Sequence, residues 1–101
     1  MNTVDARNPL SSLGHRVPTV HLNGTAHEDL LKQLSDAYCA IVEAEKTLRL
    51  ATPNGRDYYL QEHGALELAR REHADRIRAL TQVKQELEAI AIAVGDQKVR
   101  P

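Results

Sequence analysis

The chain lacks most of the residues that usually hold a small domain together. Its 101 residues include three Tyr, no Phe or Trp, and a single cysteine, Cys39. One cysteine cannot form an internal disulfide, which excludes a disulfide scaffold and fits a reducing compartment. With so few large aromatic side chains there is little material for a core, and small chains of this kind usually need a partner.

Charge imbalance and long apolar runs are missing as well. The sequence contains thirteen Lys and Arg residues and fourteen Asp and Glu residues, which gives a net charge of -1. The bulk charge therefore favours no class of partner. No apolar run is long enough to cross a bilayer, and the first twenty residues lack the apolar centre of a signal peptide. We therefore expect neither membrane insertion nor secretion by a signal peptide.

Residues 25–95 carry two amphipathic helical patterns joined by a polar loop. In both patterns apolar or small residues recur at spacings of three and four, which is typical of a coiled-coil stripe. This predicts helices over about 26–51 and 64–94, with a loop over 52–63. The first stripe contains His27, Leu30, Leu34, Ala37, Ile41, Ala44, Leu48 and Ala51, and the second Leu66, Ala69, His73, Ile77, Leu80, Val83, Leu87, Ile90 and Val94.

The two stripes can be aligned as an antiparallel pair. His27 then meets Ile90 and Ala51 meets Leu66, and small residues on one helix mostly face large ones on the other. The predicted fold class is all-α, a long antiparallel two-helix hairpin with an extended N-terminal arm, completed by oligomerisation. The stripe residues expected to be buried include Leu34, Ile41, Leu80 and Leu87.

Local signals set the expected helix ends. Thr25 and Glu28 have the spacing of a capping box, and Pro53 should end the first helix. Asn54-Gly55 is expected to supply a positive φ in the loop. Gly95 follows the last apolar residue of the second helix and suits a left-handed C-cap.

The two ends of the chain differ from this centre. Residues 1–24 are predicted to form the arm, in which Val20 and Leu22 alternate with polar neighbours and Pro18 restricts strand pairing. A lone strand is unstable, so the arm must lie on the hairpin or on another subunit, and a neighbouring chain is the expected support. Residues 96–101 form a polar tail that is expected to fray.

Partner contacts are expected on three parts of the chain: the arm, a second stripe on the first helix, and the loop. The second stripe fits either a wide buried face of the same hairpin or a second interface. Adjacent tyrosines in the loop fit either a contact surface or a plug at the end of the hairpin. The expected contact residues are Val17, Val20 and Leu22 in the arm, Leu31, Tyr38 and Val42 in the stripe, and Arg56, Tyr58 and Tyr59 in the loop.

No motif for catalysis or cofactor binding is present. The five histidines, His15, His21, His27, His63 and His73, form no close ligand pair, and the sequence has no phosphate loop or nucleophile elbow. We therefore predict a protein without catalytic, metal or cofactor residues. Nucleic-acid binding stays open through Arg56, Arg70, Arg71 and Arg78, although Glu67, Glu72 and Asp75 lie among them.

The segments 18–25 and 53–59, followed by the helix rich in Ala, Glu and Arg, resemble small helical proteins of tailed bacteriophages and prophages. The resemblance covers residues 18–94 and brings no catalytic residues. It implies a phage protein located in the bacterial cytoplasm or in the virion. The expected function is a non-enzymatic structural or accessory role through protein–protein assembly, with itself or with a larger complex. The alternatives are an inhibitor that docks on a host defence protein and a nucleic-acid-binding regulator.

Overall fold

The described residues form a helical hairpin without strands. The computed structural model describes residues 14–99, and in this range the chain forms α1 (His27–Leu50), the short 3-10 helix η2 (Gly55–Asp57) and α2 (Ala65–Gly95). Both long helices begin and end within one residue of their predicted bounds. The predicted arm residues 1–13 and tail residues 100–101 lie outside the described range.

The start of α1 differs slightly from the predicted capping box. The first backbone bond of the helix runs from the Leu30 N–H to the Ala26 carbonyl at 3.0 Å. Ala26 therefore occupies the cap position that the sequence assigned to Thr25. Glu28 and Asp29 still lie in the first turn, where their negative charge interacts favourably with the positive end of the helix dipole.

The positive backbone φ that the sequence placed at Gly55 and Gly95 occurs instead at Gly64, where φ is +90° directly before α2. Gly55 begins η2, because the Asn54 side chain accepts a bond from the Arg56 N–H and caps that turn. Gly95 remains helical, and the Asp96 N–H continues the helical bonds by donating to the Ile92 carbonyl. Both glycine predictions were therefore wrong.

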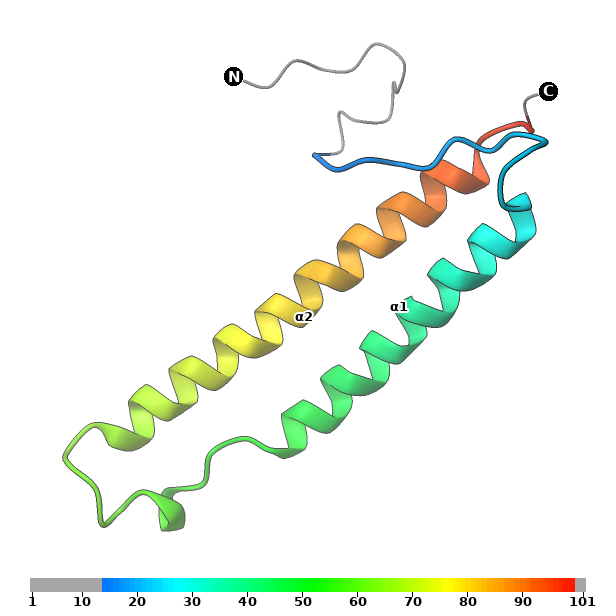
Figure 1. Cartoon of the computed structure of the whole chain (residues 1–101). Coiled ribbons are helices and arrows are strands. Elements are labelled where there is room, and N and C mark those ends of the chain that lie inside the picture. Colours follow the sequence, from blue (N-terminus) through cyan, green and yellow to red (C-terminus); the bar gives the residue numbers. More distant parts are fainter. Residues whose placement is uncertain (1–13, 100–101) are drawn as a thin grey trace. The chain divides into compact units, whose positions relative to one another are not determined.

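The chain packs as two compact units. Unit 1 contains the described residues up to Tyr38 together with those from Gln85 onward, and unit 2 is Cys39–Lys84. Both helices pass through both units. In each unit a segment of α1 lies beside a segment of α2 that runs in the opposite direction (Figure 1).

The core of unit 1 forms where the arm crosses the ends of the helices. Val17 and Val20 from the arm are buried with Ala93 and Val94 of α2. The half-buried side chains that pack against this cluster are Leu30, Leu31, Leu34 and Ile90. The arm therefore lies on the hairpin of its own chain, whereas a neighbouring chain was the expected support.

Gln97 fastens the arm to the end of α2. Its side-chain Oε1 accepts from the Val20 N–H at 2.9 Å, and its Nε2 donates to the Pro18 carbonyl at 2.7 Å. One amide side chain thus satisfies two backbone groups of the arm, as a neighbouring strand would. The tail was expected to fray at this position, and instead it holds the arm.

The helix register in unit 1 is shifted from the predicted one by about one turn. His27 Nε2 donates to the Val94 carbonyl at 2.7 Å, whereas the predicted alignment placed His27 opposite Ile90. The alignment matched small residues with large ones along two stripes. It did not include the two arm valines, which occupy part of the space beside the C-terminal end of α2.

In unit 2 most of the predicted stripe lies in the interior, but at Ala44 and Val83 a neighbouring residue takes the inward position. Glu45 is buried, whereas the stripe residue Ala44 is exposed. Lys84 is half-buried, whereas the stripe residue Val83 is 42% exposed. On an α-helix, residues at i+3 and i+4 lie on the same face, so either can turn inward. Of the four stripe residues expected to be buried, Ile41 and Leu80 of this unit are half-buried, and so are Leu34 and Leu87 of unit 1.

Neither helix of the described chain combines the length and the apolar character that crossing a membrane requires.

Candidate interaction surfaces

Two residues that were expected to contact a partner are buried in the core of the chain itself. Val17 is 4% exposed and Val20 is 1% exposed, because both pack against Ala93 and Val94. Their side chains are therefore not accessible to another protein, and this corrects the prediction for these two residues. Leu22, two residues further on, is 70% exposed and keeps its place as a predicted contact.

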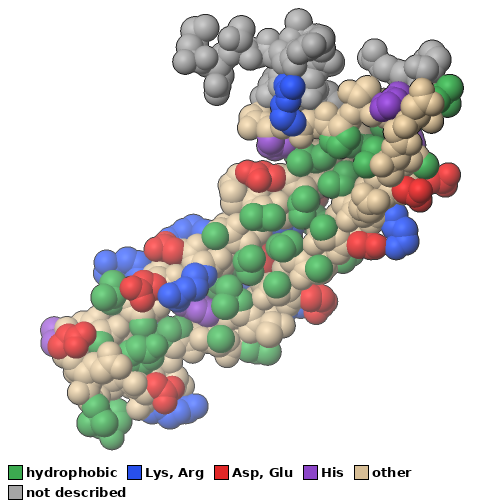
Figure 2. Space-filling model, in the orientation of Figure 1, with side chains coloured by type: hydrophobic (Ala, Val, Ile, Leu, Met, Phe, Trp, Pro, Cys, Tyr) green, Lys and Arg blue, Asp and Glu red, His purple; other side chains and the backbone are tan. Residues whose placement is uncertain are grey.

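The second stripe of α1 divides among three environments. Leu31 packs against the arm core. Tyr38 lines an apolar groove of about 230 Å³ in unit 1, and Val42 is half-buried in unit 2. The groove is lined by Leu34, Ser35 and Tyr38 of α1 and by Leu87, Glu88, Ala91 and Ile92 of α2. On the face that Figure 2 shows, apolar side chains gather mainly between the two helices, and charged side chains lie mainly toward the outer edges.

The loop between the helices is a series of closed turns. Backbone bonds run from the Asp57 N–H to the Asn54 carbonyl, from Tyr58 to Gly55, from Gln61 to Tyr58 and from Ala65 to Glu62, all between 3.0 and 3.1 Å. Arg70 of α2 also reaches the Pro53 carbonyl at 3.5 Å. A loop with this many local bonds presents its side chains from a defined backbone.

The loop side chains differ strongly in exposure. Tyr58 is half-buried, whereas Tyr59 is 76% exposed and Arg56 is exposed. Leu60 and Leu50 are 86% and 88% exposed, and neither was among the predicted contact residues. The sequence could have indicated both, because each is a large apolar residue outside both predicted stripes.

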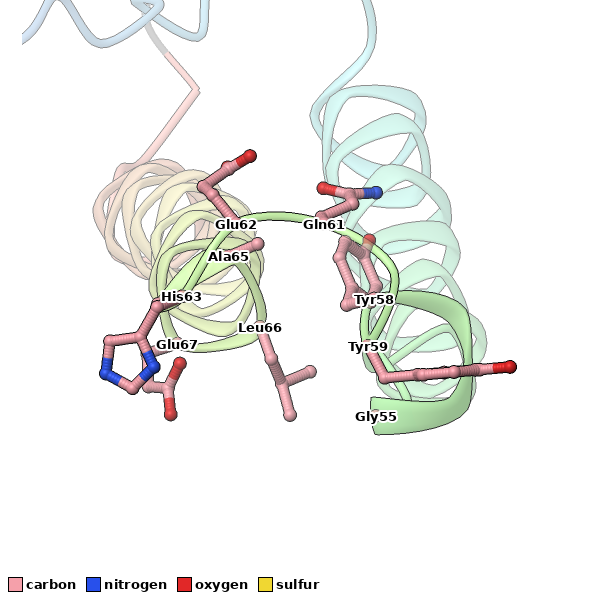
Figure 3. A pocket seen from close by; sticks show the side chains of 10 residues that line it. Gly55, Tyr58, Tyr59, Gln61, Glu62, His63, Ala65, Leu66 and Glu67 are labelled. Atoms are coloured by element: carbon pink, nitrogen blue, oxygen red, sulfur yellow. The ribbon is translucent and has the colours of Figure 1, made fainter.

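A hollow of about 380 Å³ lies at this loop. Its side chains do not converge on one point: Glu62 and Gln61 lie on one side, His63 and Glu67 on another, and Tyr59 extends away from α2 (Figure 3). Acid–base catalysis needs two groups directed at the same reacting atom. The labelled side chains in this hollow do not offer that arrangement.

Unit 2 contains a buried ion pair. Lys84 Nζ lies 2.7 Å from Glu45 Oε1, and the Thr81 hydroxyl donates to the other carboxylate oxygen. These two hydrogen bonds hold the pKa of Glu45 below its ordinary value, against the opposing effect of desolvation. A carboxylate held ionised in this way orients the two helices, and its oxygens are occupied within the chain.

His73 is the other buried polar side chain of unit 2. It is 6% exposed, and its Nε2 has no hydrogen-bond partner among the described residues. Over residues 14–99, no three His, Cys, Asp or Glu side chains gather in a group that could hold a metal ion. His73 therefore buries a ring nitrogen that has no partner among the described residues, which is costly for stability.

The arginines of α2 belong to a mixed surface. Arg78 pairs with Asp75, and Arg70 bonds the Pro53 carbonyl. The segment Cys39–Lys84 contains eight Lys and Arg residues and seven Asp and Glu residues. Phosphate binding depends on excess local positive charge, so this composition gives the nucleic-acid alternative little support.

Comparison of the chain with models of known protein families, with curated proteins and with solved structures gave no match.

Proposed function

We propose that the protein is a non-enzymatic component that acts through protein–protein assembly, and that the loop between α1 and α2 contacts the partner. The observation that supports this proposal is the exposure of Tyr59 and Leu60, two adjacent large side chains on a loop of closed turns. Leu50, at the end of α1, adds a third exposed side chain in the same unit.

The physical argument concerns the cost of binding. A partner that covers Leu60 gains the free energy of removing a leucine from water, about 1.5–3 kcal/mol when the side chain is fully buried. Tyr59 offers a large ring and a hydroxyl with few rotatable bonds, which is why tyrosines are enriched at interfaces. Because the loop backbone is already bonded to itself, little further ordering is needed on association.

The resemblance to small helical phage proteins suggests the setting. A phage protein of this size would act as a structural or accessory component in the virion, or on a host protein in the bacterial cytoplasm. In either case it would work by docking rather than by catalysis. The proposal assigns no catalytic, metal-binding or cofactor-binding residue.

Site-specific photo-crosslinking in the organism that encodes the protein tests the proposal. A photoreactive amino acid at Tyr59 or Leu60 should give a discrete crosslinked species, identified by mass spectrometry. The same amino acid at Arg71, which is exposed on α2 of the same unit, serves as the matched control. Partners found in purified phage particles would indicate a structural role, and host proteins would indicate an inhibitor.

Equal crosslinking at Tyr59, Leu60 and Arg71, or none at all three, would overturn the loop as the docking surface. Salt-dependent retention on DNA that is lost on replacing Arg71 and Arg78 by Gln would favour the nucleic-acid alternative instead.

A further inference from the structure

The groove in unit 1 is an apolar surface that no described residue covers. Its most accessible apolar lining side chain is Ile92, which is 60% exposed, while Leu34, Tyr38 and Leu87 are half-buried. Ala91 and Ser35 are small and lie between the larger groups. The groove therefore has a hollow floor and a projecting apolar side chain at its rim.

The chain's own core ends before this groove. Among the described residues of unit 1, the four that are buried lie where the arm meets the end of α2: Val17, Val20, Ala93 and Val94. Leu34 packs against that core and also lines the groove, so the groove continues the core in the direction of Tyr38. Two helices in one layer leave such a face open, and a second helical hairpin can bury it in a four-helix bundle.

Charge restricts what can cover the groove. Glu88 lines it and forms no ion pair within the described residues. Covering this face with an uncharged surface would desolvate the carboxylate without compensation. The occupant must therefore bring a cation to the level of Glu88.

A second copy of the chain brings Lys32. His27 and Val94 lie side by side through their 2.7 Å hydrogen bond. Lys32 lies five residues after His27 on α1, and Glu88 lies six residues before Val94 on α2. Because the helices are antiparallel, both steps lead away from that level in the same direction, by about 7.5 Å and about 9 Å along the helix axes at 1.5 Å per residue. Lys32 and Glu88 thus lie at nearly the same height on opposite helices of unit 1.

We propose that this groove is a self-association surface, in which two copies of unit 1 face each other across a twofold axis parallel to the helices. Rotation about such an axis swaps the positions of α1 and α2 across the interface and leaves the position of each residue along the helix axis unchanged. It places α1 of each copy on α2 of the other and brings each Lys32 beside the Glu88 of the opposite copy. Ile92 lies about 3 Å from the level of His27 and Val94, so each Ile92 then packs against the first turns of the partner's α1, at the rim of the groove.

A second copy suits this surface because one chain carries both halves of the contact, as an isologous interface requires. The groove and the projecting Ile92 occur together. Lys32 does not line the groove, but it precedes the lining residue Ser35 by three positions and so borders this face of α1. In the free chain, Lys32 Nζ lies 2.7 Å from Asp36, with both side chains well exposed. An exposed pair of this kind is weak, so Lys32 can turn to Glu88 at little cost. The surface is separate from the loop residues Tyr59 and Leu60, and neither proposal depends on the other.

Charge reversal followed by sedimentation equilibrium tests the proposal on the full chain. The experiment uses reducing buffer, because Cys39 is exposed and a disulfide-linked dimer would imitate the result. The wild type should dimerise at micromolar concentration, and Lys32→Glu or Glu88→Lys alone should raise the dissociation constant at least tenfold. The double variant should return to within about threefold of the wild type, since 1.4 kcal/mol corresponds to one factor of ten.

Two controls separate this interface from a general effect of charge or folding. Lys46→Glu removes a comparable exposed pair, Lys46–Glu43 in unit 2, and should leave the dissociation constant unchanged. Ile92→Asp should abolish the dimer, whereas Leu68→Asp, at a residue 50% exposed in unit 2, should not. Circular dichroism establishes that each variant keeps its helices.

Several outcomes would overturn the proposal. A wild type that stays monomeric at high micromolar concentration excludes self-association. A dimer that resists both single charge reversals, or whose loss the double variant does not restore, excludes the Lys32–Glu88 arrangement. Dissociation by Leu68→Asp but not by Ile92→Asp would place the interface on a different surface.

Discussion

Replacing Val20 by alanine should destabilise the protein even though Val20 lies in the arm, outside both helices. The valine is 1% exposed and belongs to the cluster with Val17, Ala93 and Val94. Its replacement removes the equivalent of two methylene groups, each worth about 0.8 kcal/mol when buried. With incomplete closure of the cavity, the expected loss in free energy of unfolding is about 2 kcal/mol.

Gln97 supplies a second, independent perturbation of the same contact. Gln97→Ala removes the bonds to the Val20 N–H and the Pro18 carbonyl, each worth about 0.5–1.5 kcal/mol net. The expected loss is therefore about 1–3 kcal/mol. Because both substitutions release the same arm, the double variant should lose less than the sum of the two single losses.

Urea denaturation followed by circular dichroism measures these losses. Leu22→Ala is the matched control, because Leu22 is in the same arm and 70% exposed, and it should change the free energy of unfolding by less than about 0.5 kcal/mol. If Val20→Ala cost no more than Leu22→Ala, the arm would not be docked on its own hairpin. The original expectation of an arm held by a neighbouring chain would then return, with a loss that depends on protein concentration.

Three further predictions concern the ion pair, the buried histidine and the glycines. The depressed pKa of Glu45 means that its contribution to stability is present above the ordinary glutamate pKa and is lost as pH falls through the lower folded value. In thermal melts over this range, Glu45→Gln should therefore flatten the acid-side fall in Tm, while Glu43→Gln, at an exposed site, should follow the wild type. His73→Leu should stabilise the protein by about 1–2 kcal/mol in urea denaturation, since it removes a buried nitrogen without a partner, and a loss would mean that the nitrogen is bonded in solution. Gly64→Ala should cost about 1–2 kcal/mol because φ is +90° there, whereas Gly95→Ala, inside α2, should be neutral or stabilising by up to about 1 kcal/mol. The reverse order for the two glycines in the same assay would mean that the left-handed residue is Gly95.

The sequence predicted the helices well because helix formation leaves a local signal. The recurrence of apolar residues every three or four positions depends on the backbone of one segment alone. It therefore located α1, α2 and the loop between them without any information on contacts. The loop tyrosines were found for a similar reason, as large apolar rings outside a helical stripe.

The same signal predicted the rotation of each helix about its axis only approximately. Ala44 and Glu45 differ by about 100° on the helix surface, and hydrophobicity favoured the alanine. The structure buries Glu45 instead, because Thr81 and Lys84 of the other helix satisfy both carboxylate oxygens. A buried carboxylate is tolerable only with such partners, and its partners lie 36 and 39 residues away.

By itself, then, the sequence determined the elements and their order, because apolar periodicity and proline act within a few residues. Only the tertiary structure decided that the arm docks on its own chain, where the Gln97 amide reaches Val20 and Pro18 across 77 and 79 residues. It also decided that His27 meets Val94 rather than Ile90. Such contacts join residues far apart in the chain, and their free energy depends on the packing of all the groups around them, which no local pattern records.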